Sequence, residues 1–190
     1  YVSRMRSELQ KSMVSLEDFL MSLEMKAIIK QADDFSLPRV TSLVNKTNQF
    51  NLTTRRYTAS EIERMKERKN KFSLYTLQVI DKFGDEGIVG VAIIRKEPQT
   101  WVIDSFLMSC RVIGRKIETA FLASIVADAK KNGVSTIIGE YILTKKNEPA
   151  KSFYPDHGFS KQKDFEWVLN LTKSTVKTPP WVEVRVEPPE

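Results

Sequence analysis

The chain has 190 residues, with 30 Lys or Arg against 24 Asp or Glu and a formal net charge of +6. A hydrophobic share of 41% and a charged share of 28% are typical of a globular chain rather than a disordered or fibrous one, and the length predicts one ordinary domain. The single cysteine, Cys110, and the single histidine, His157, exclude an internal disulfide and a zinc site built from several Cys and His ligands.

The N-terminal third of the chain predicts helices around one strand. Hydrophobic residues at helical spacing predict an amphipathic helix, within which Ser15 before Asp18 could cap a second, shorter helix. We interpret residues 1–24 as a helical linker from an upstream domain. Ser60 and Glu63 have the spacing of a capping box. The elements predicted here are a helix over 3–23, a strand over 25–29, a helix over 37–48, a loop over 48–58 and a helix over 60–69.

The rest of the chain predicts a sheet crossed by one long helix. Short turns favour an antiparallel meander for the first three strands, and Asn132-Gly133 is a stop signal after the long helix. The elements predicted here are strands over 72–80, 88–95 and 101–108, a helix over 117–129, a strand over 134–141, a short helix over 148–156 and a hairpin over 159–171. The order indicates an α/β (α+β) domain over 25–172, around a mainly antiparallel sheet with one possible parallel pair.

The C-terminal tail differs in composition from the domain. Residues 173–190 hold four of the eight prolines, so we expect this segment to be extended or poorly ordered. Trp181 within it is expected to anchor on the body of the domain or on a neighbouring chain.

Charge and hydropathy also limit the partners. The basic residues are scattered, and the densest segment, Arg64–Lys71, is interrupted by Glu67, which favours a solvated helix face over a nucleic-acid site. No apolar stretch approaches the roughly 18 residues of a membrane span. We therefore expect a cytoplasmic protein with no nucleic-acid or membrane partner.

A strand, a short loop with glycine and a helix N-terminus follow one another near residue 110. Free backbone N–H groups and the helix dipole favour an anion at such a place, and the loop's Arg and Lys side chains suit phosphate oxygens. An ordinary loop with solvated arginines is the alternative. The cofactor-binding residues predicted here are Leu107, Met108, Ser109, Arg111, Val112, Ile113, Gly114, Arg115 and Lys116.

The pattern Arg111-x-x-Gly114 resembles the acyl-CoA pyrophosphate loop of GNAT acyltransferases, Gln/Arg-x-x-Gly-x-Gly/Ala. The order of elements matches that fold from Met25 to about Leu171. Three segments also resemble the C-terminal, GNAT-like half of FkbH-like proteins. They are 48–57 (NQFNLTTRRY), 109–115, and Phe153-Tyr154 with His157-Gly158-Phe159.

This resemblance implies an acyltransferase domain that follows a HAD-like phosphatase domain. The family loads a glyceryl unit, from a phosphorylated glycolytic acid, onto the phosphopantetheine thiol of an acyl carrier protein. The product serves methoxymalonyl-type polyketide extender units. The Asp-x-Asp signature of the phosphatase is absent from the chain, so phosphate removal is not assigned to it.

Lys116 departs from the GNAT pattern, which has Gly or Ala there. Its side chain could crowd the diphosphate of CoA, or it could pair with the single phosphate of a carrier-protein arm, which we favour. An acetyl-CoA-dependent N-acetyltransferase and a non-catalytic module that docks a carrier protein are the alternatives.

Four residues are candidates for catalysis. Cys110 could carry the acyl group as a thioester, since a helix N-terminus and Arg111 favour the thiolate, or it could be a small buried apolar residue. His157 could act as a base, although a turn-capping role is favoured. Tyr154 matches the GNAT general acid or is a packed aromatic residue, and Glu140 is a general base or an ion-pair partner.

The remaining candidates bind the arm and the acceptor. Asn147 matches a residue that bonds the pantetheine arm in many GNAT enzymes, although helix N-capping explains it equally well. Amides and paired arginines in the loop after the second predicted helix suit a phosphorylated three-carbon acid; solvent exposure without a ligand is the alternative. These substrate-binding candidates are Asn48, Gln49, Asn51, Arg55 and Arg56.

Overall fold

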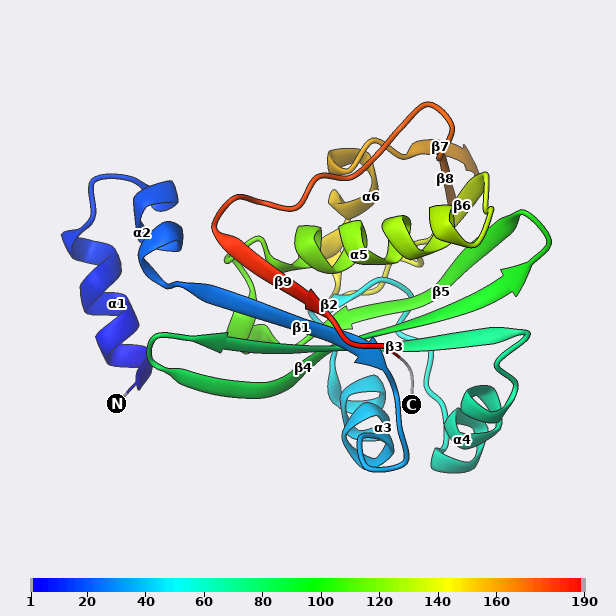
Figure 1. The fold of residues 1–190 in the computed structure, drawn as a ribbon, viewed down its shortest axis with the longest axis horizontal. Helices are drawn as coiled ribbons and strands as arrows, with labels where there is room; N and C mark the ends of the chain where they lie inside the picture. The colour runs from blue at the N-terminus through cyan, green and yellow to red at the C-terminus, as the bar shows by residue number, and fades with distance from the viewer. Residues whose placement is uncertain (1, 189–190) are drawn as a thin grey trace.

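The computed structural model describes residues 2–188. Helices and strands alternate around one twisted sheet (Figure 1). The helices are α1 (Val2–Ser12), α2 (Leu16–Ser22), α3 (Leu37–Lys46), α4 (Ala59–Glu67), α5 (Ile117–Lys131) and α6 (Phe153–Asp156), with short 3₁₀ turns η1 (Cys110–Val112) and η2 (Glu148–Ala150). The strands are β1 (Met25–Gln31), β2 (Phe50–Asn51), β3 (Phe72–Asp81), β4 (Gly84–Glu97), β5 (Thr100–Met108), β6 (Thr136–Glu140), β7 (Ser160–Lys163), β8 (Glu166–Asn170) and β9 (Val182–Val186).

The strands of the described chain form one sheet in the order β7-β8-β6-β5-β4-β3-β1-β9, with β2 paired to β5 outside this path. Neighbouring strands are antiparallel except for β5 with β6 and β1 with β9. The parallel pair of β5 and β6 arises because α5 connects them as a crossover. The predicted α/β class with a mainly antiparallel sheet is therefore confirmed.

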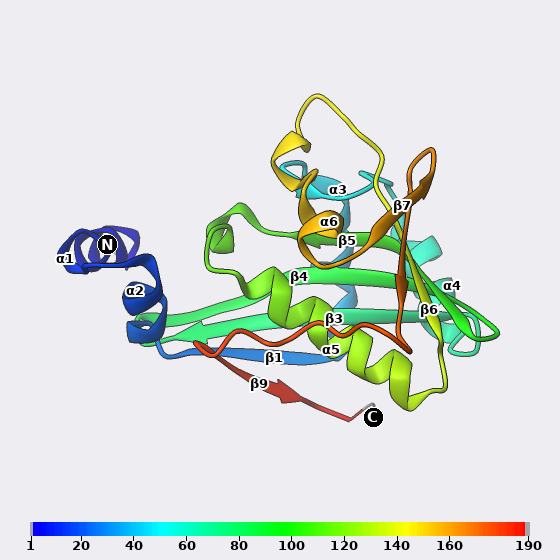
Figure 2. The same cartoon turned by 90° about the horizontal axis from the view of Figure 1, so that it is seen from above.

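The sheet lies between two helical layers. Helix α5 covers one face, and α3 and α4 cover the opposite face (Figures 1 and 2). Phe106 on β5 and Phe121 on α5 are both fully buried, with ring centroids 5.1 Å apart. Each such side chain contributes roughly 1.5–3 kcal/mol through burial, so α5 is fixed on the sheet beside the loop that precedes it.

The N-terminal segment forms two helices, not one. The Ser15 hydroxyl accepts a hydrogen bond from the backbone N–H of Asp18, which confirms the cap of the shorter helix. Phe19 and Leu20 of α2 are buried in the core, and Arg6 of α1 forms an ion pair with Asp81. Residues 2–24 are thus packed against the domain rather than only leading into it.

Three local expectations need correction. The capping box of α4 uses Thr58 and Glu61 rather than Ser60 and Glu63, because Thr58 is the last residue with extended backbone. The loop expected over 48–58 contains the short strand β2. The helix expected over 148–156 is split into η2 and α6.

The tail adds a strand to the sheet. Val182–Val186 pairs in parallel with β1, so the sheet extends beyond the predicted 25–172 boundary. The connection from β8 passes over α5 to reach this edge (Figures 1 and 2). Trp181 donates its indole N–H to the carbonyl of Arg115 at 3.3 Å, which anchors the tail on the body as expected.

Candidate functional site

Two carboxylates mark the point where the parallel strands β5 and β6 separate. The last paired residues are Ile103 and Gly139. The next residue on each strand is an acid, Asp104 on β5 and Glu140 on β6, and their side chains are only 9% and 6% exposed. Buried carboxylates require charged or hydrogen-bonding partners, so their surroundings decide what they can do.

The partners of these carboxylates come from the loop before α4 and from β4. The Nη1 atom of Arg55 forms ion pairs with both acids, lying 2.9 Å from Asp104 Oδ1. The hydroxyl of Tyr57 donates to Asp104 Oδ2 at 2.8 Å. Arg95 lies 3.7 Å from Asp104 and 3.6 Å from Glu140. We call these five residues the separation cluster.

The cluster fixes the protonation of its basic and phenolic members. Burial alone would lower the pKa of Arg55, but the hydrogen bond to Glu140 and the charges of Asp104 and Glu140 raise it. Burial and the neighbouring Asp104 carboxylate raise the pKa of Tyr57. Arg55 is therefore charged and Tyr57 is a hydrogen-bond donor at neutral pH.

Tyr154 borders the cluster from α6. Its ring lies against Gly139, where an added Cβ would be 2.2 Å from the ring, so only glycine permits this contact. The hydroxyl donates to the carbonyl of Glu140 at 3.4 Å, and complete burial raises the pKa of Tyr154 well above its usual value. The structure thus brings the candidates Tyr154, Glu140 and Arg55 together in one region.

The loop after β5 leads to the N-terminus of α5. Gly114 has φ 87° with open space around it, and Lys116 has φ 58° as the N-cap. A left-handed lysine is unusual, because β-carbon contacts favour glycine in this region. Arg111 and Lys116 are exposed. The first N–H groups of the 15-residue helix α5 have no partner within the helix, and two exposed cations lie in the loop that leads to them.

Arg115 does not contribute to this positive surface. Its guanidinium turns inward and lies 3.2 Å from Asp81 and 3.4 Å from Glu86, near the turn between β3 and β4. Burial and the neighbouring Arg6 lower its pKa. The expectation that Arg115 faces a phosphate is corrected, because its charge is already compensated inside the protein.

The other predicted loop residues divide by burial. Leu107, Met108 and Val112 are buried, whereas Cys110 is exposed on η1, which overturns the buried alternative for this cysteine. Ser109 accepts a hydrogen bond from the N–H of Arg111, and Ile113 is 40% exposed.

From Asp104 to Met108 the strand rises about 13 Å. Cys110 therefore lies at the α5 end of β5 rather than at the carboxylates.

Asn147 is fully buried and its side chain holds two other segments in place. The amide donates to the carbonyls of Asn51 at 2.8 Å and Ile142 at 2.9 Å, and the amide oxygen accepts the N–H of Thr144. All of these partners are backbone groups of the chain itself. The amide is consequently not available to a pantetheine arm in this conformation, contrary to expectation.

Asn51 belongs to β2, which lies along β5. Phe50 and Asn51 pair with Met108 and Leu107, and the Asn51 amide bonds the carbonyl of Thr47 at 3.1 Å. The edge of β5 beyond the last pair with β6 is thus covered by the chain itself.

The remaining predicted residues lie outside the separation cluster. Arg56 binds the carbonyls of Val44 and Thr47 and the side chain of Asn48, which fixes the end of α3. Gln49 is exposed. The two ring nitrogens of His157 lie 2.8 Å from the Thr119 hydroxyl and 2.6 Å from the carbonyl of Phe153. These contacts fix local turns and helix ends rather than the surroundings of the carboxylates.

Sequence reasoning missed Asp104, Tyr57 and Arg95. Asp104 was detectable, since it is an acid inside the otherwise apolar segment WVIDSFLM. Buried acids are rarely found in strands without a partner. Tyr57 and Arg95 carried no local signal, because their relation to Asp104 depends on the fold.

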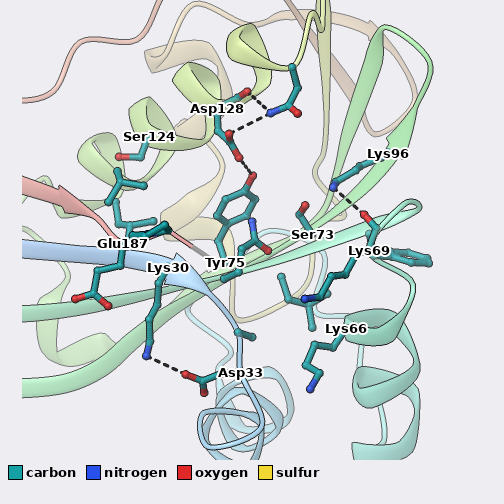
Figure 3. A pocket seen from close by; sticks show the side chains of 18 of the residues that line it. Lys30, Asp33, Lys66, Lys69, Ser73, Tyr75, Lys96, Ser124, Asp128 and Glu187 are labelled. Atoms are coloured by element: carbon teal, nitrogen blue, oxygen red, sulfur yellow. Dashed lines mark hydrogen bonds and ion pairs between the residues drawn. The ribbon is translucent and has the colours of Figure 1, made fainter. Parts of the chain in front are cut away.

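An open hollow of about 1060 Å³ lies near the other end of α5. Figure 3 shows Asp128 reaching the hydroxyl of Tyr75 from α5, while Lys96 donates to the carbonyl of Lys69 at 2.9 Å. Lys30 and Asp33 form a pair at the rim, 2.9 Å apart. None of the residues that the sequence predicted for the site lines this hollow.

Comparison with solved structures shows the GNAT fold. An acetyltransferase of the GNAT family from Staphylococcus aureus is 14% identical, with a TM-score of 0.57 over 76% of this chain and 99% of the other. The ribosomal-protein-S18-alanine N-acetyltransferase of Escherichia coli is 13% identical, with a TM-score of 0.55 over 75% and 89%. The PaiA N-acetyltransferase of Thermoplasma acidophilum, solved with coenzyme A, is 11% identical, with a TM-score of 0.57 over 75% and 96%.

No family model matches the chain, and no curated protein matches it. Within residues 2–188, no helix is long and apolar enough to cross a membrane. The chain therefore has a GNAT-like fold, and its chemistry has to be argued from the separation cluster and the loop before α5.

Proposed function

We propose that the domain is an acyltransferase that uses a phosphopantetheine thioester as donor. The observation that carries this proposal is the pair of buried carboxylates, Asp104 and Glu140, one on each strand at the point where β5 and β6 separate. Solved proteins with the same fold include acetyltransferases, one of them with coenzyme A.

The nucleophile would bond to the acyl carbon of the thioester as the C–S bond breaks, and the sulfur would leave as a thiolate that takes up a proton. Glu140 would accept the proton of the attacking nucleophile, with its carboxylate held in place by Arg95 of β4. In the structure Asp104 holds Arg55 and Tyr57 over that carboxylate. Tyr154, kept protonated by burial, would hold its hydroxyl beside the carbonyl of Glu140.

The phosphate end of such a donor fits the start of α5. Gly114 leaves space at the backbone, and exposed Arg111 and Lys116 flank the free N–H groups of the helix. The arm between phosphate and thioester does not fit as simply, because β2 covers β5 between the two places. No step is therefore assigned to the arm.

Coenzyme A, as a thioester donor, and the arm of an acyl carrier protein, as a thiol acceptor, share the phosphopantetheine group and its phosphate. The inward turn of Arg115 leaves Lys116 and Arg111 as the loop's exposed cations, and Arg111 is already 3.7 Å from Glu86, so the loop suits a single phosphate such as that of a carrier arm. This supports, as the second candidate, glyceryl or phosphoglyceryl transfer onto a carrier-protein thiol for methoxymalonyl-type extender units, downstream of a HAD-like phosphatase domain. A covalent role for Cys110, which is exposed on η1 at the phosphate end, would require the thiol of the carrier arm to approach that end rather than the carboxylates.

Mass spectrometry of the products of acyl transfer distinguishes the two candidate reactions. The chain is given acetyl-CoA with amine acceptors, and separately a phosphorylated glyceryl donor with a phosphopantetheinylated carrier protein. Acetylated amine supports the CoA donor. Glyceryl-loaded carrier supports the second candidate, and the Cys110→Ser variant then decides the covalent step, since unchanged loading would remove it. Transfer in neither arm would contradict the proposed function.

A further inference from the structure

The segment Phe50–Tyr57, which we call the groove segment, lies between β5 and the chain that follows β6. Leu52 joins the two sides: its N–H donates to the carbonyl of Phe106 at 3.1 Å, and its carbonyl accepts the N–H of Ile142 at 2.8 Å. Its side chain is fully buried. The space opened by the separation of the strands is therefore filled by the protein itself.

This position coincides with the path that the proposed donor has to take. Its phosphate end would lie at the start of α5, after Met108, and its reacting end at Asp104. The direct route between them is the free edge of β5, a distance of about 13 Å for four residues. The groove segment occupies this edge through β2, through Leu52, and through Thr53, whose hydroxyl donates to the carbonyl of Asp104 at 3.0 Å.

The same segment also covers the carboxylates. Arg55 extends from it to Asp104 and Glu140, and Tyr57 extends from it to Asp104. The side chain of Arg55 is 29% exposed, so it reaches the acids from the solvent side. A single displacement of this segment would open the edge of β5 and uncover both carboxylates.

Thr54 shows that the groove segment is held under strain. It has φ 56°, a conformation that is an outlier for a β-branched residue. Its hydroxyl oxygen is buried without a hydrogen-bond partner among the described residues. The surrounding hydrogen bonds maintain this locally unfavourable backbone: the Thr54 N–H donates to Asn51 Oδ1 at 2.9 Å, and Asn147 holds the carbonyls of Asn51 and Ile142.

We propose that the groove segment is an internal occupant of the donor path and leaves β5 when a phosphopantetheine donor binds. This inference rests on the proposed function and adds its regulation. Donor affinity is then reduced by the free energy needed to expel the segment, so changes that weaken its attachment tighten donor binding.

Hydrogen exchange with mass spectrometry tests the displacement directly. Coenzyme A and free phosphopantetheine are the probes, each added to the wild-type chain. We expect the backbone amides of residues 50–55 to lose protection when a probe binds, while those of β3 and β4 keep theirs.

Calorimetry on variants tests the energetic link. Asn147→Ala removes the amide that ties Asn51 to Ile142, and we expect coenzyme A to bind about tenfold more tightly. Thr53→Val removes one hydrogen bond to β5 and serves if the first variant does not fold. Thr54→Asn relieves the strain, because Asn adopts positive φ more readily, and it is expected to weaken binding about threefold.

Asn132→Ala, at the far end of α5, is the matched control and should bind as the wild type does. If a probe binds while residues 50–55 stay protected, or if Asn147→Ala and Thr53→Val leave binding unchanged or weaker, the inference is overturned and the proposed function stands. If neither probe binds the wild type or any variant, the proposed function fails and the inference fails with it.

Discussion

Two clusters in this molecule each join arginines to two carboxylates, and they differ in how far the arginines are exposed to solvent. The separation cluster lies where β5 and β6 diverge, whereas the second, which we call the hairpin cluster, lies where β3 turns into β4. The ionic groups are Arg55, Arg95, Asp104 and Glu140 in the separation cluster, and Arg6, Arg115, Asp81 and Glu86 in the hairpin cluster. The exposed Arg111 also lies 3.7 Å from Glu86, at the surface of the hairpin cluster.

The arginines of the hairpin cluster are enclosed, with Arg6 at 12% and Arg115 at 10% exposure. They tie α1 and the loop before α5 to one buried acid, Asp81. In the separation cluster the acids are buried but the arginines are 29% and 40% exposed. Carboxylates that are enclosed yet covered by half-exposed arginines can be uncovered without opening the core. The comparison supports the proposed chemistry in the separation cluster and predicts that the hairpin cluster serves the assembly of the fold.

Removing the proposed base should produce the largest effect. In Glu140→Gln the side chain keeps its size but no longer accepts a proton, so the rate of acyl transfer should fall by roughly 10²- to 10⁴-fold. The melting temperature should change little, because the partly exposed Arg55 keeps Asp104 as a partner. Single-turnover transfer followed by mass spectrometry, together with thermal unfolding, gives both quantities.

Glu166→Gln is the matched control, since Glu166 pairs with Glu140 in the neighbouring strand β8 and bonds the exposed Lys163. Its transfer rate should equal that of the wild type. A wild-type rate in Glu140→Gln would remove the catalytic role of the separation cluster and with it the contrast between the two clusters.

The hairpin cluster should respond in stability. The side chain of Asp81 is 0% exposed and pairs with both Arg6 and Arg115. In Asp81→Asn two enclosed guanidinium groups lose a charge partner, and breaking buried pairs in this way costs about 3–5 kcal/mol. For a chain of this size each kcal/mol lowers the melting temperature by roughly 2–4 °C.

Chemical denaturation followed by fluorescence measures that loss. Asp85→Asn is the control from the same turn, because its carboxylate bonds Gln78 and the N–H of Gly87. A loss for Asp81→Asn no larger than that of the control would mean that the hairpin cluster does not stabilise the fold.

The sequence predicted those features whose residues all lie within one short segment. The loop from Arg111 to Gly114 before an apolar helix identified the start of α5, and the candidates Glu140 and Tyr154 lie in contact in the fold. Alternating valines at 182–186 were a strand signal, but the flanking prolines made the tail look irregular. A two-residue strand such as β2 carries no periodicity and was not predictable.

Orientation was the part that sequence could not supply. Arg115 has the spacing of a phosphate ligand, yet it turns inward because the hairpin brings Asp81 and Glu86, 34 and 29 residues earlier, beside it. Asn147 has the position of an arm-binding residue, yet it is saturated by backbone groups of Asn51 and Ile142. In both cases residues that are distant in the sequence but close in the fold satisfy the hydrogen-bonding groups of the side chain that was expected to bind a ligand.

A partly exposed ion pair should contribute less to stability than either cluster. Asp33 lies 2.9 Å from Lys30 and also accepts the N–H of Ser36 at the start of α3. The hydrogen bond from Lys30 lowers the pKa of Asp33, burial opposes this, the bonds from Ser36 and the charge of Lys30 add to the lowering, and the net pKa is about 2. A carboxyl group with a lowered pKa stabilises the fold above its unfolded value of 3.8, and this contribution is lost as the pH falls towards 2.

The smallest expected effect follows from this pair. Because the group is partly exposed, Asp33→Asn should cost only about 1 kcal/mol at pH 7, and the difference from the wild type should vanish near pH 2. Urea unfolding at several pH values measures it, with the highly exposed Asp34→Asn as control. A difference that persists at pH 2 would show that the side chain of Asp33 acts through packing rather than charge. Only the separation cluster and the hairpin cluster would then remain as evidence that ionic groups organise this domain.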